Sequence, residues 1–599
     1  KPAKRFADVS LWHPPVPDIP LAVLEDKVVN RTLREYPHLF AVVTPVRVER
    51  FAELLQDHPN QPFVQSVVRA LREGFWPYAD AKPPSYPDTW DERRPGRLDD
   101  DAAAFLQAQR DEEVALGRYS AAFGPDLLPG MYCMPVHVVP KPHSAKLRLV
   151  NDQSAGAYSL NSMIRPESIK GAVLDGVPAL GDSLRRFRAV HGDAPLIMWK
   201  SDVSQAYRRM PVAPHWQIRQ VVSIGQDRHV DRCNLFGGRG SLRVFSAFNA
   251  LLSWVAEEKF AVKHKHNYVD DDYGFALFGD VEWYPPYQRY LPTPQARLLK
   301  CWDHVGVPHD ANKQLAGPSL PIIGFLVDPN SMTVTLTSDG KQRLLDALDD
   351  FCDLSPGNRR RSLATFQAFA GYANWAFNVF PLLKPALSNI YDKMQGKSDK
   401  HAGIYVNSAI VCDLRWMRQH VALSSGVHML SAEAWSPADL TQDNPQHEFA
   451  LTDASGRGLG IYFPWLRLGL HCELPTDAPV GTIFFFEALA VCAAIHRARI
   501  WKRAGRSIRR LAVLSDNSNS VAIFNSLRAS PAYNTILTSA VDVMLDCALD
   551  IRVEHIPGAS NIVADALSRG KLDLVKQLVP GIDILPFTPP QDALGAVRQ

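Results

Sequence analysis

Two adjacent aspartates, Asp270 and Asp271, stand in the segment Tyr-Val-Asp-Asp between apolar flanks. Their carboxylates repel each other, and burying both is costly unless a large positive charge lies beside them. A pair of divalent metal ions would supply that charge, because carboxylate oxygens are the ligands that Mg²⁺ prefers. A two-metal site needs further carboxylates, and Asp202 upstream is the candidate. The chemistry that this pattern indicates is phosphoryl transfer.

A second set of acidic residues lies far downstream in the chain. It comprises Asp453, Glu487, Asp516 and Asp565. Glu487 is the clearest of them physically, because three phenylalanines precede it and an alanine and a leucine follow it. A carboxylate in such surroundings needs a partner of opposite charge. Two acidic clusters in this order indicate a nucleic-acid polymerase followed by a nuclease.

The composition is that of a globular protein with several domains. The chain has 599 residues, too many for one hydrophobic core, so three or four domains are expected. Its hydrophobic fraction of 46% and charged fraction of 21% are ordinary. The net charge of +2 creates no overall basic field, so nucleic acid would have to bind at local arginine patches. The patches are Arg185–Arg188, Arg208–Arg209, Arg359–Arg361 and Arg497–Arg510.

The cysteines and the apolar runs bear on the cellular compartment. Eight cysteines are scattered without a Cys-x-x-Cys pair, which argues against a disulfide framework and structural zinc and fits a reducing compartment. The printed sequence opens on Lys-Pro-Ala-Lys-Arg without an apolar signal region, and no apolar run reaches membrane length. We therefore expect a soluble intracellular protein, in the cytoplasm or nucleus, without a membrane partner.

Apolar periodicity and turn residues predict the order of the elements. Residues 1–120 are expected to form an N-terminal extension with some helices. Strands are then predicted at 131–140, 146–150, 196–199 and, twice, within 221–235, with a helix at 246–260. Helices follow at 341–351, 363–380 and 384–394. Strands return at 449–452 and 466–473, before a helix from Glu487 and strands at 510–514 and 551–555.

Five segments in order resemble the motifs of reverse transcriptases. They are Lys-Leu-Arg-Leu-Val-Asn-Asp (146–152), Asp-Val-Ser-Gln-Ala-Tyr (202–207), Phe-Gly-Gly-Arg-Gly-Ser-Leu-Arg-Val-Phe (236–245), Tyr-Val-Asp-Asp (268–271) and Ile-Gly-Phe-Leu-Val-Asp (323–328). The resemblance implies that Asp202, Asp270 and Asp271 hold two Mg²⁺ ions, with Mn²⁺ as an alternative. Asp272, the third consecutive carboxylate, is expected to be a surface residue beyond the turn.

The same resemblance assigns residues to the incoming dNTP. Lys141 and Arg148 match two fingers residues that grip the triphosphate. Tyr207 matches an aromatic residue whose ring lies under the sugar and excludes a 2′-hydroxyl, with core packing as the other interpretation. Phe236 and Gly237 match residues beside the nucleotide and the template base.

Further positions match motifs that handle the leaving group and the primer. Lys313 matches a lysine that protonates the pyrophosphate, and a surface lysine is the other interpretation. The segment Ile323-Gly324-Phe325 matches the primer grip, where glycine permits close approach of the backbone. Around Leu242 the chain departs from the family pattern, because a leucine replaces the common proline. That departure concerns template contacts rather than metal binding.

Four later segments resemble a ribonuclease H domain. They are Leu-Thr-Asp-Ala-Ser (451–455), Phe-Phe-Glu-Ala-Leu-Ala (485–490), Leu-Ser-Asp-Asn (514–517) and the run from Glu554 to Arg569. The resemblance implies that Asp453, Glu487, Asp516 and Asp565 hold two metal ions. His555 matches a mobile histidine that helps product release, and a polar loop residue is the other interpretation.

Together these resemblances imply an α+β right-hand polymerase with fingers, palm and thumb, followed by an α/β ribonuclease H-like domain. The expected domains are 1–120, N-terminal extension; 121–340, fingers and palm; 341–446, helical thumb or connection; 447–570, ribonuclease H; and 571–599, a loosely attached tail.

The implied function is DNA synthesis on RNA and DNA templates with cleavage of the RNA strand of RNA/DNA hybrids. Partners would be template–primer nucleic acid, RNA/DNA hybrid and dNTPs; the oligomeric state stays open, a homodimer included. Residues 370–387 and the segment Ala-Asp-Ala-Leu-Ser-Arg (564–569) resemble sequences of retrotransposons of the gypsy and DIRS groups, DIRS in particular. The alternative is a domesticated nucleic-acid-binding protein with reduced catalysis.

Overall fold

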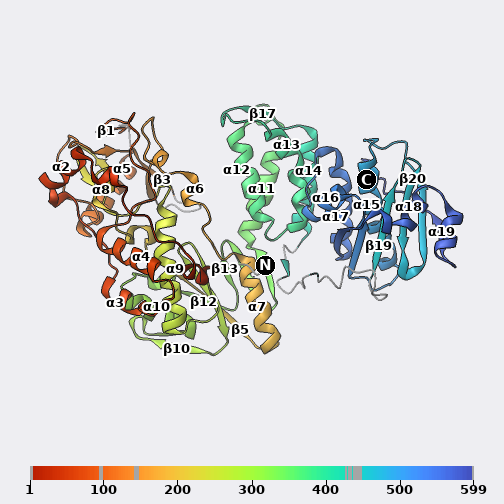
Figure 1. Ribbon diagram of the computed structural model, residues 1–599, viewed down its shortest axis with the longest axis horizontal. Coiled ribbons are helices and arrows are strands. Elements are labelled where there is room, and N and C mark those ends of the chain that lie inside the picture. Colours follow the sequence, from red (N-terminus) through yellow and green to blue (C-terminus); the bar gives the residue numbers. More distant parts are fainter. Residues whose placement is uncertain are drawn as a thin grey trace. The chain divides into compact units, whose positions relative to one another are not determined.

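A computed structural model describes residues 5–93, 99–140, 147–424, 428–429, 435 and 448–595. The chain divides into two compact units, unit 1 (1–332) and unit 2 (333–599). Figure 1 shows helices and several separate sheets in both units, so the chain is of mixed α and β structure. In the described parts, no helix is both long and apolar enough to cross a membrane.

The central sheet of unit 1 carries the first acidic cluster. Its strands, in spatial order, are β12 (Leu315–Gly317), β5 (Leu196–Asp202), β9 (Asp271–Leu277) and β8 (Lys265–Tyr268). All three pairings are antiparallel. Strand β5 extends three residues beyond the predicted 196–199, because it continues to pair with β9 up to Asp202.

Two helices pack against the central sheet. They are α9 (Ser241–Phe260) and α10 (Thr293–Val305). Helix α9 begins five residues before the predicted 246, and its first turn contains the buried Val244 and Phe245. Trp199 of β5 is fully buried in the same apolar cluster as residues of both helices. This cluster fixes the end of β5 where Asp202 lies.

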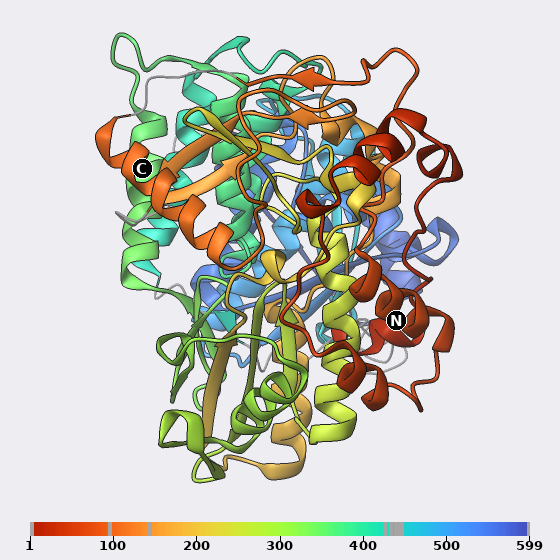
Figure 2. The same cartoon turned by 90° about the vertical axis from the view of Figure 1, so that its left-hand side faces the viewer.

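The N-terminal helices belong to the core of unit 1. Helices α3 (Val48–Leu54) and α4 (Gln61–Glu73) contribute Phe51 and Phe63 to the cluster around α9. The rings of Phe51 and Phe248 lie 5.2 Å apart. In Figures 1 and 2 these red helices lie against the yellow-green α9. The predicted helices are present, but this segment supports the core instead of extending from it.

A second sheet and a hairpin lie in the same unit as the central sheet. The sheet contains β1 (Trp90–Asp91), β2 (Tyr132–Cys133), β6 (Val221–Ile224) and β7 (Asp227–Val230). The hairpin is formed by β3 (Val136–Pro140) and β4 (Leu147–Asn151). Helix α5 (Asp100–Ala115) lies close to β4 and β6. These elements bring residues from three sequence regions to one cavity, described below.

The remaining elements of unit 1 are short, apart from one helix. They are α1 (Leu21–Leu24), α2 (Lys27–Glu35), α6 (Pro166–Ile169), α7 (Val177–His191), α8 (Pro214–Gln217), β10 (Val281–Tyr284), β11 (Arg289–Pro292), β13 (Leu320–Ile322) and β14 (Phe325–Asp328). The β13–β14 turn has positive φ at both Ile323 and Gly324, the backbone geometry of a tight hairpin.

Unit 2 begins with a short strand, continues with helices near the predicted positions, and ends with a six-stranded sheet. Its first elements are β15 (Thr333–Leu336), α11 (Ser338–Cys352), β16 (Arg360–Ser362), α12 (Leu363–Ala376), α13 (Ser388–Met394), β17 (Gly403–Tyr405), α14 (Ser408–Leu423) and β18 (His428–Met429). Helix α12 stops four residues before the predicted 380. Pro381 and Pro385 lie in a 3₁₀ segment that delays α13 to Ser388, since proline lacks the amide hydrogen of a regular α-helix.

The sheet of unit 2 is mixed, with order β23-β22-β19-β20-β21-β24. The strands are β19 (Phe449–Ala454), β20 (Gly458–Phe463), β21 (Leu468–Glu473), β22 (Arg510–Ser515), β23 (Asp550–His555) and β24 (Asp583–Pro586). The helices are α15 (Ile483–Arg503), α16 (Ser518–Ser526), α17 (Asn534–Cys547), α18 (Ile562–Ser568) and α19 (Leu572–Leu578). Helix α15 is apolar almost all round and is buried through most of its length.

The expectation of a loosely attached C-terminal tail is wrong. Strand β24 pairs in parallel with β21 from Leu468 to His471, and so forms one edge of the sheet. Ala593 and Leu594 are buried in the core of this sheet and α15. The prolines of this segment misled the prediction, because proline is compatible with an edge strand.

The expectation that Asp272 is a surface residue is also wrong. It is 1% exposed, and its Oδ1 lies 2.5 Å from Nζ of the equally buried Lys265 on the neighbouring strand. Strand alternation does turn Asp272 away from Asp271, as expected, but the opposite face of the sheet is core rather than solvent. The third aspartate is thus half of a buried ion pair.

We predict that Asp272→Asn lowers the free energy of unfolding around β9 by about 3–5 kcal/mol, because it leaves Lys265 buried and unpaired. Combining Asp272→Leu with Lys265→Met should recover most of the loss, since both charges are then removed. Hydrogen exchange of β9 peptides in increasing urea measures the change. The exposed Asp193→Asn is the control, expected within about 0.5 kcal/mol of wild type. An unchanged free energy of unfolding in Asp272→Asn would mean that the ion pair between Asp272 and Lys265 does not contribute to stability.

Candidate active sites

The three aspartates of unit 1 are brought together by one strand pairing and one turn. In the antiparallel register of β5 and β9, Asp202 lies directly opposite Asp271. Asp270 occupies the β8–β9 turn, after Val269 at φ +60°. The turn is held from two sides: Asn249 of α9 donates to the Val269 carbonyl at 3.2 Å, and the Val203 amide donates to the Asp270 carbonyl at 3.3 Å.

Two lysines neutralise part of this acidic cluster. Lys313 Nζ lies 2.6 Å from Asp202 Oδ2, and Lys200 Nζ lies 2.8 Å from Asp271 Oδ2. Burial raises the pKa of Asp202, and the hydrogen bond from Lys313 opposes the rise. Burial together with the charges of Asp202 and Asp271 raises the pKa of Asp270 to about 6. Asp270 therefore bears most of the uncompensated repulsion, which a divalent cation would relieve.

A cavity of about 260 Å³ opens beside Asp202 and Asp270. Its wall includes Arg148 of β4, Phe236 and Lys313, so cationic, aromatic and acidic groups from distant parts of the sequence meet there. The guanidinium of Arg148 lies 5.4 Å from the centre of the Phe236 ring. The wall contains three cations and four carboxylates in all, so a phosphate-bearing ligand would fit there when a metal ion accompanies it and offsets the negative charge.

Tyr207 and Gly237 support the same wall. The Tyr207 ring lies 5.1 Å from that of Phe236 and 5.9 Å from that of Phe245, at the edge of the core around α9. Burial and the charge of Asp270 raise the pKa of Tyr207 to about 12. Gly237 has φ +115°, and a Cβ there would collide with the Asn151 carbonyl. Lys141, the other predicted phosphate ligand, lies outside the described residues.

The second acidic cluster is formed by two strand ends and a helix. Asp453 lies on β19 and Asp516 directly follows β22, and these strands pair in parallel with Thr452 opposite Ser515. Glu487 projects from α15 to the same place. One oxygen from each of these three carboxylates lies within 4.8 Å of the others. In the described parts of the chain this is the one such group, and Asp202, Asp270 and Asp271 do not form another.

The electrostatics of this triad fit a divalent cation. Glu487 is 5% exposed, and its Oε2 has no hydrogen-bond partner among the described atoms. Burial raises the pKa of Glu487 to about 8, with Asp453 and Asp516 adding to the rise. Burial likewise raises the pKa of Asp453 to about 6, although the Ser568 hydroxyl donates to its carboxylate. Three converging carboxylates with one buried orphan oxygen are the donor set that Mg²⁺ or Mn²⁺ takes.

Asp565 and His555 lie at the edge of this triad. Asp565 is on α18, where Arg569 Nε donates to its Oδ1 at 2.7 Å. It is not part of the close group, yet its charge contributes to the raised pKa of Asp453. Asn561 anchors this helix by donating to the Thr452 carbonyl at 2.9 Å. His555 is exposed at the end of β23, opposite Ser515, the residue before Asp516.

Comparison with solved structures finds distant likenesses. One foamy viral protease-reverse transcriptase (dRH) in complex with double-stranded DNA is 14% identical, with a TM-score of 0.43, over 92% of this chain and 85% of that chain. Another with double-stranded DNA is 15% identical, with a TM-score of 0.43, over 86% and 98%. A third, with an RNA/DNA hybrid, is 14% identical, with a TM-score of 0.41, over 85% and 63%.

No family model matches the chain, and no curated protein matches it. At such identities and TM-scores, function has to be argued from the residues of the chain itself.

Several residues in these sites were not anticipated from the sequence. Lys200, Ser568 and Arg569 each contact a predicted carboxylate. Two of these three residues could have been found from their spacing in the sequence. Lys200 is two residues before Asp202 and so shares its face of β5, and Arg569 is four residues after Asp565 at helical spacing. Ser568 is recognisable only from the fold, because its carboxylate partner lies 115 residues away.

We predict that Glu487→Gln stabilises the metal-free protein at pH 8. The pKa of Glu487 rises from 4.5 to about 8 on folding, so the folded state keeps a proton that the unfolded chain releases. Stability is therefore lost as the pH rises through this interval, and glutamine does not suffer the loss. In EDTA at pH 8 the variant should melt at least about 2 °C above wild type, with the gap closing towards pH 5.

Calorimetry of the full chain measures both effects. Mg²⁺ should raise the melting temperature of wild type but raise that of Glu487→Gln much less, because a metal ligand is missing. Glu473→Gln, an exposed residue at the end of β21, is the matched control and should follow wild type throughout. A gap that persists unchanged at pH 5 would contradict the electrostatic explanation.

Proposed function

We propose that this chain is a reverse transcriptase that synthesises DNA on RNA and DNA templates and, at a second site, cleaves the RNA strand of RNA/DNA hybrids. One observation supports this most strongly. The chain contains two separate clusters of partly or fully buried, mutually repelling carboxylates, and the first adjoins a cavity whose wall contains cations as well as carboxylates. A protein that only bound nucleic acid would gain nothing from burying such charges.

In the first site Asp202, Asp270 and Asp271 would hold Mg²⁺, or alternatively Mn²⁺. Bound there, the metal would lower the pKa of the primer 3′-hydroxyl and neutralise the triphosphate of a dNTP. Arg148 would bind phosphate oxygens at the cavity wall. Lys313 is suited to give a proton to the leaving pyrophosphate: burial alone lowers its pKa, but Asp202 raises it, so the ammonium form persists at neutral pH.

In the second site Asp453, Glu487 and Asp516 would hold the metal, and Asp565 would join them on release from Arg569. The metal would supply a hydroxide and stabilise the departing oxygen of the RNA phosphodiester. His555, exposed beside the strand end that precedes Asp516, would help the cleaved product to leave. Substrates would be a template–primer duplex and an RNA/DNA hybrid, in the synthesis of retroelement cDNA of a DIRS-like kind.

We predict that the two activities separate by mutation, because each acidic cluster lies within one unit. Asp271→Asn should reduce primer extension on poly(rA)/oligo(dT) at least about 100-fold, since a bound metal contributes several kcal/mol to charge stabilisation. Hybrid cleavage should continue. Asp453→Asn should give the reverse result, with Asp193→Asn as the control that keeps both activities.

Each outcome of this experiment bears on a different part of the proposal. Primer extension at the wild-type rate by Asp271→Asn would refute the polymerase site. Hybrid cleavage by Asp453→Asn at the wild-type rate would refute the nuclease site. If wild type shows neither activity with Mg²⁺ or Mn²⁺, the alternative of a nucleic-acid-binding protein is supported.

Tyr207 is predicted to select deoxyribonucleotides. Tyr207→Val removes the ring packed on Phe236, so a 2′-hydroxyl gains space and incorporation of rNTPs should rise at least about tenfold relative to dNTPs. Single-nucleotide extension with UTP and dTTP measures the ratio, and Tyr207→Phe, which keeps the ring, is the matched control. An unchanged ratio in Tyr207→Val would assign the residue to core packing alone.

A further inference from the structure

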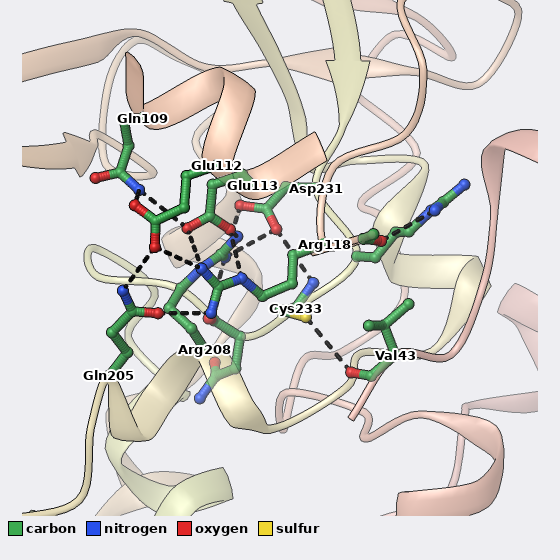
Figure 3. A network of polar contacts seen from close by, with 12 residues as sticks. Val43, Gln109, Glu112, Glu113, Arg118, Gln205, Arg208, Asp231 and Cys233 are labelled. Carbon is green, nitrogen blue, oxygen red and sulfur yellow. Dashed lines mark hydrogen bonds and ion pairs between the residues drawn. The ribbon is translucent and has the colours of Figure 1, made fainter. Parts of the chain in front are cut away.

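Four charged side chains form a buried cluster next to the loop that follows Asp202 (Figure 3). Arg118 binds Glu113 through two hydrogen bonds of 2.8 Å. Arg208 binds Glu113 at 2.5 Å and Asp231 at 2.8 and 2.9 Å. Each of the four side chains is less than a tenth exposed. These four charges sum to zero, and the half-exposed Glu112 adds a fifth charge 3.8 Å from Arg118.

Such a cluster is an expensive way to hold a core together. Apolar residues of similar volume stabilise a fold as well as a buried ion pair, or better. What the charges add is a fixed geometry, because a guanidinium fork binds only in defined directions. The cluster joins three elements: Glu113 belongs to α5, Arg208 to the 3₁₀ turn Ala206–Arg209, and Asp231 follows β7.

Gln205 connects the cluster to the Asp202 loop. Arg118 Nη1 donates to Gln205 Oε1 at 2.6 Å, and Gln205 Nε2 donates to Glu112 Oε1 at 3.3 Å. Figure 3 shows the Gln205 side chain between these two partners. Its backbone is left-handed, with φ +53° and ψ +46°, a region that residues other than glycine seldom adopt. Both hydrogen bonds hold it there.

Gln205, clamped by its hydrogen bonds to Arg118 and Glu112, lies between two predicted functional residues. Gln205 is three positions after Asp202 and two before Tyr207. Its side chain lines the same cavity as Asp202, Asp270 and Arg148. A left-handed residue reverses the chain direction, so its conformation decides how the carboxylate and the ring are placed relative to each other.

We propose that Arg118 and Gln205 are positioning residues for the nucleotide cavity. Arg118, held by the buried cluster, fixes Gln205 in the left-handed conformation, and this holds the loop from Asp202 to Tyr207 in the form that an incoming dNTP binds. Neither residue has a hydrogen bond to Asp202 among the contacts of the described residues. The inference rests on the proposed polymerase function and extends it to α5, which the sequence places outside the catalytic core.

The test uses two substitutions at the clamped residue in the full-length chain. Gln205→Ala removes both side-chain hydrogen bonds, and alanine, like glutamine, adopts positive φ only at a cost in free energy. Gln205→Gly removes the clamp but makes positive φ easy. For dTTP incorporation on poly(rA)/oligo(dT), Gln205→Ala should raise KM about tenfold and change kcat less than about threefold. Gln205→Gly should stay within about threefold of the wild-type KM.

A second arm addresses Arg118. Arg118→Lys keeps the charge of the cluster and loses the fork, so it should reproduce the KM of Gln205→Ala. Adding Gln205→Ala to it should then cause no further rise, because the hydrogen bond between Arg118 and Gln205 is already lost. Discrimination between dTTP and UTP should fall in Gln205→Ala and recover in Gln205→Gly. Hybrid cleavage and the hydrogen exchange of β5 peptides serve as controls for folding.

The outcomes are distinguishable. Wild-type KM in Gln205→Ala would overturn the inference and leave the proposed function standing. The inference would also be overturned, with the proposed function still standing, if Gln205→Gly raises KM as much as Gln205→Ala and both variants lose kcat. That result would indicate that Gln205 has a structural role only. If wild type itself incorporates no nucleotide, the proposed function fails and the inference fails with it.

Discussion

The repulsion between partly or fully buried carboxylates is the constraint around which both units are arranged. In each unit the backbone brings acidic groups together where burial weakens their solvation, and the pKa of Asp270, Asp453 and Glu487 rises in consequence. Such sites do not arise from packing, because each buried charge opposes folding. The rest of the fold can be understood as the structure needed to hold these groups in place.

The two clusters differ in how they are compensated. In unit 1, Lys200 pairs with an oxygen of Asp271 and Lys313 with an oxygen of Asp202. Asp270 therefore keeps most of the repulsion from its neighbouring carboxylates. In unit 2 no lysine contacts the triad among the described residues, and relief comes from a hydroxyl on Asp453. The converged carboxylates of unit 2 form a group within 4.8 Å, whereas those of unit 1 do not. Burial is the main cause of the raised pKa of Glu487, and the close approach of Asp453 and Asp516 adds to it.

The sequence predicted that acidic residues distant in the chain converge, and Asp453, Glu487 and Asp516 do so in the structure. A turn with two aspartates, a glutamate among phenylalanines and strands ending in aspartate can all be recognised within ten residues. Their compensation could not be predicted, because it depends on long-range packing: Ser568 reaches Asp453 across 115 residues, and Lys313 reaches Asp202 across 111. The prediction for Asp272 was wrong for the same reason, since nothing in the local sequence distinguishes the solvent-exposed face of a strand from its buried face. The roles of the individual site residues stay predictions.

The N- and C-terminal segments show a related limit. Proline-rich and polar sequence suggested an extension and a tail, yet Phe51 packs on α9 and β24 completes a sheet. Sparse apolar residues suffice when a neighbouring element offers an apolar surface, and that surface is invisible in the segment itself. Helix α5 is the clearest case, because its Glu113 is buried and pairs with Arg118 and Arg208, which follow it in sequence. A charged helix that resembles a solvated one in sequence can therefore hold a loop beside a cavity.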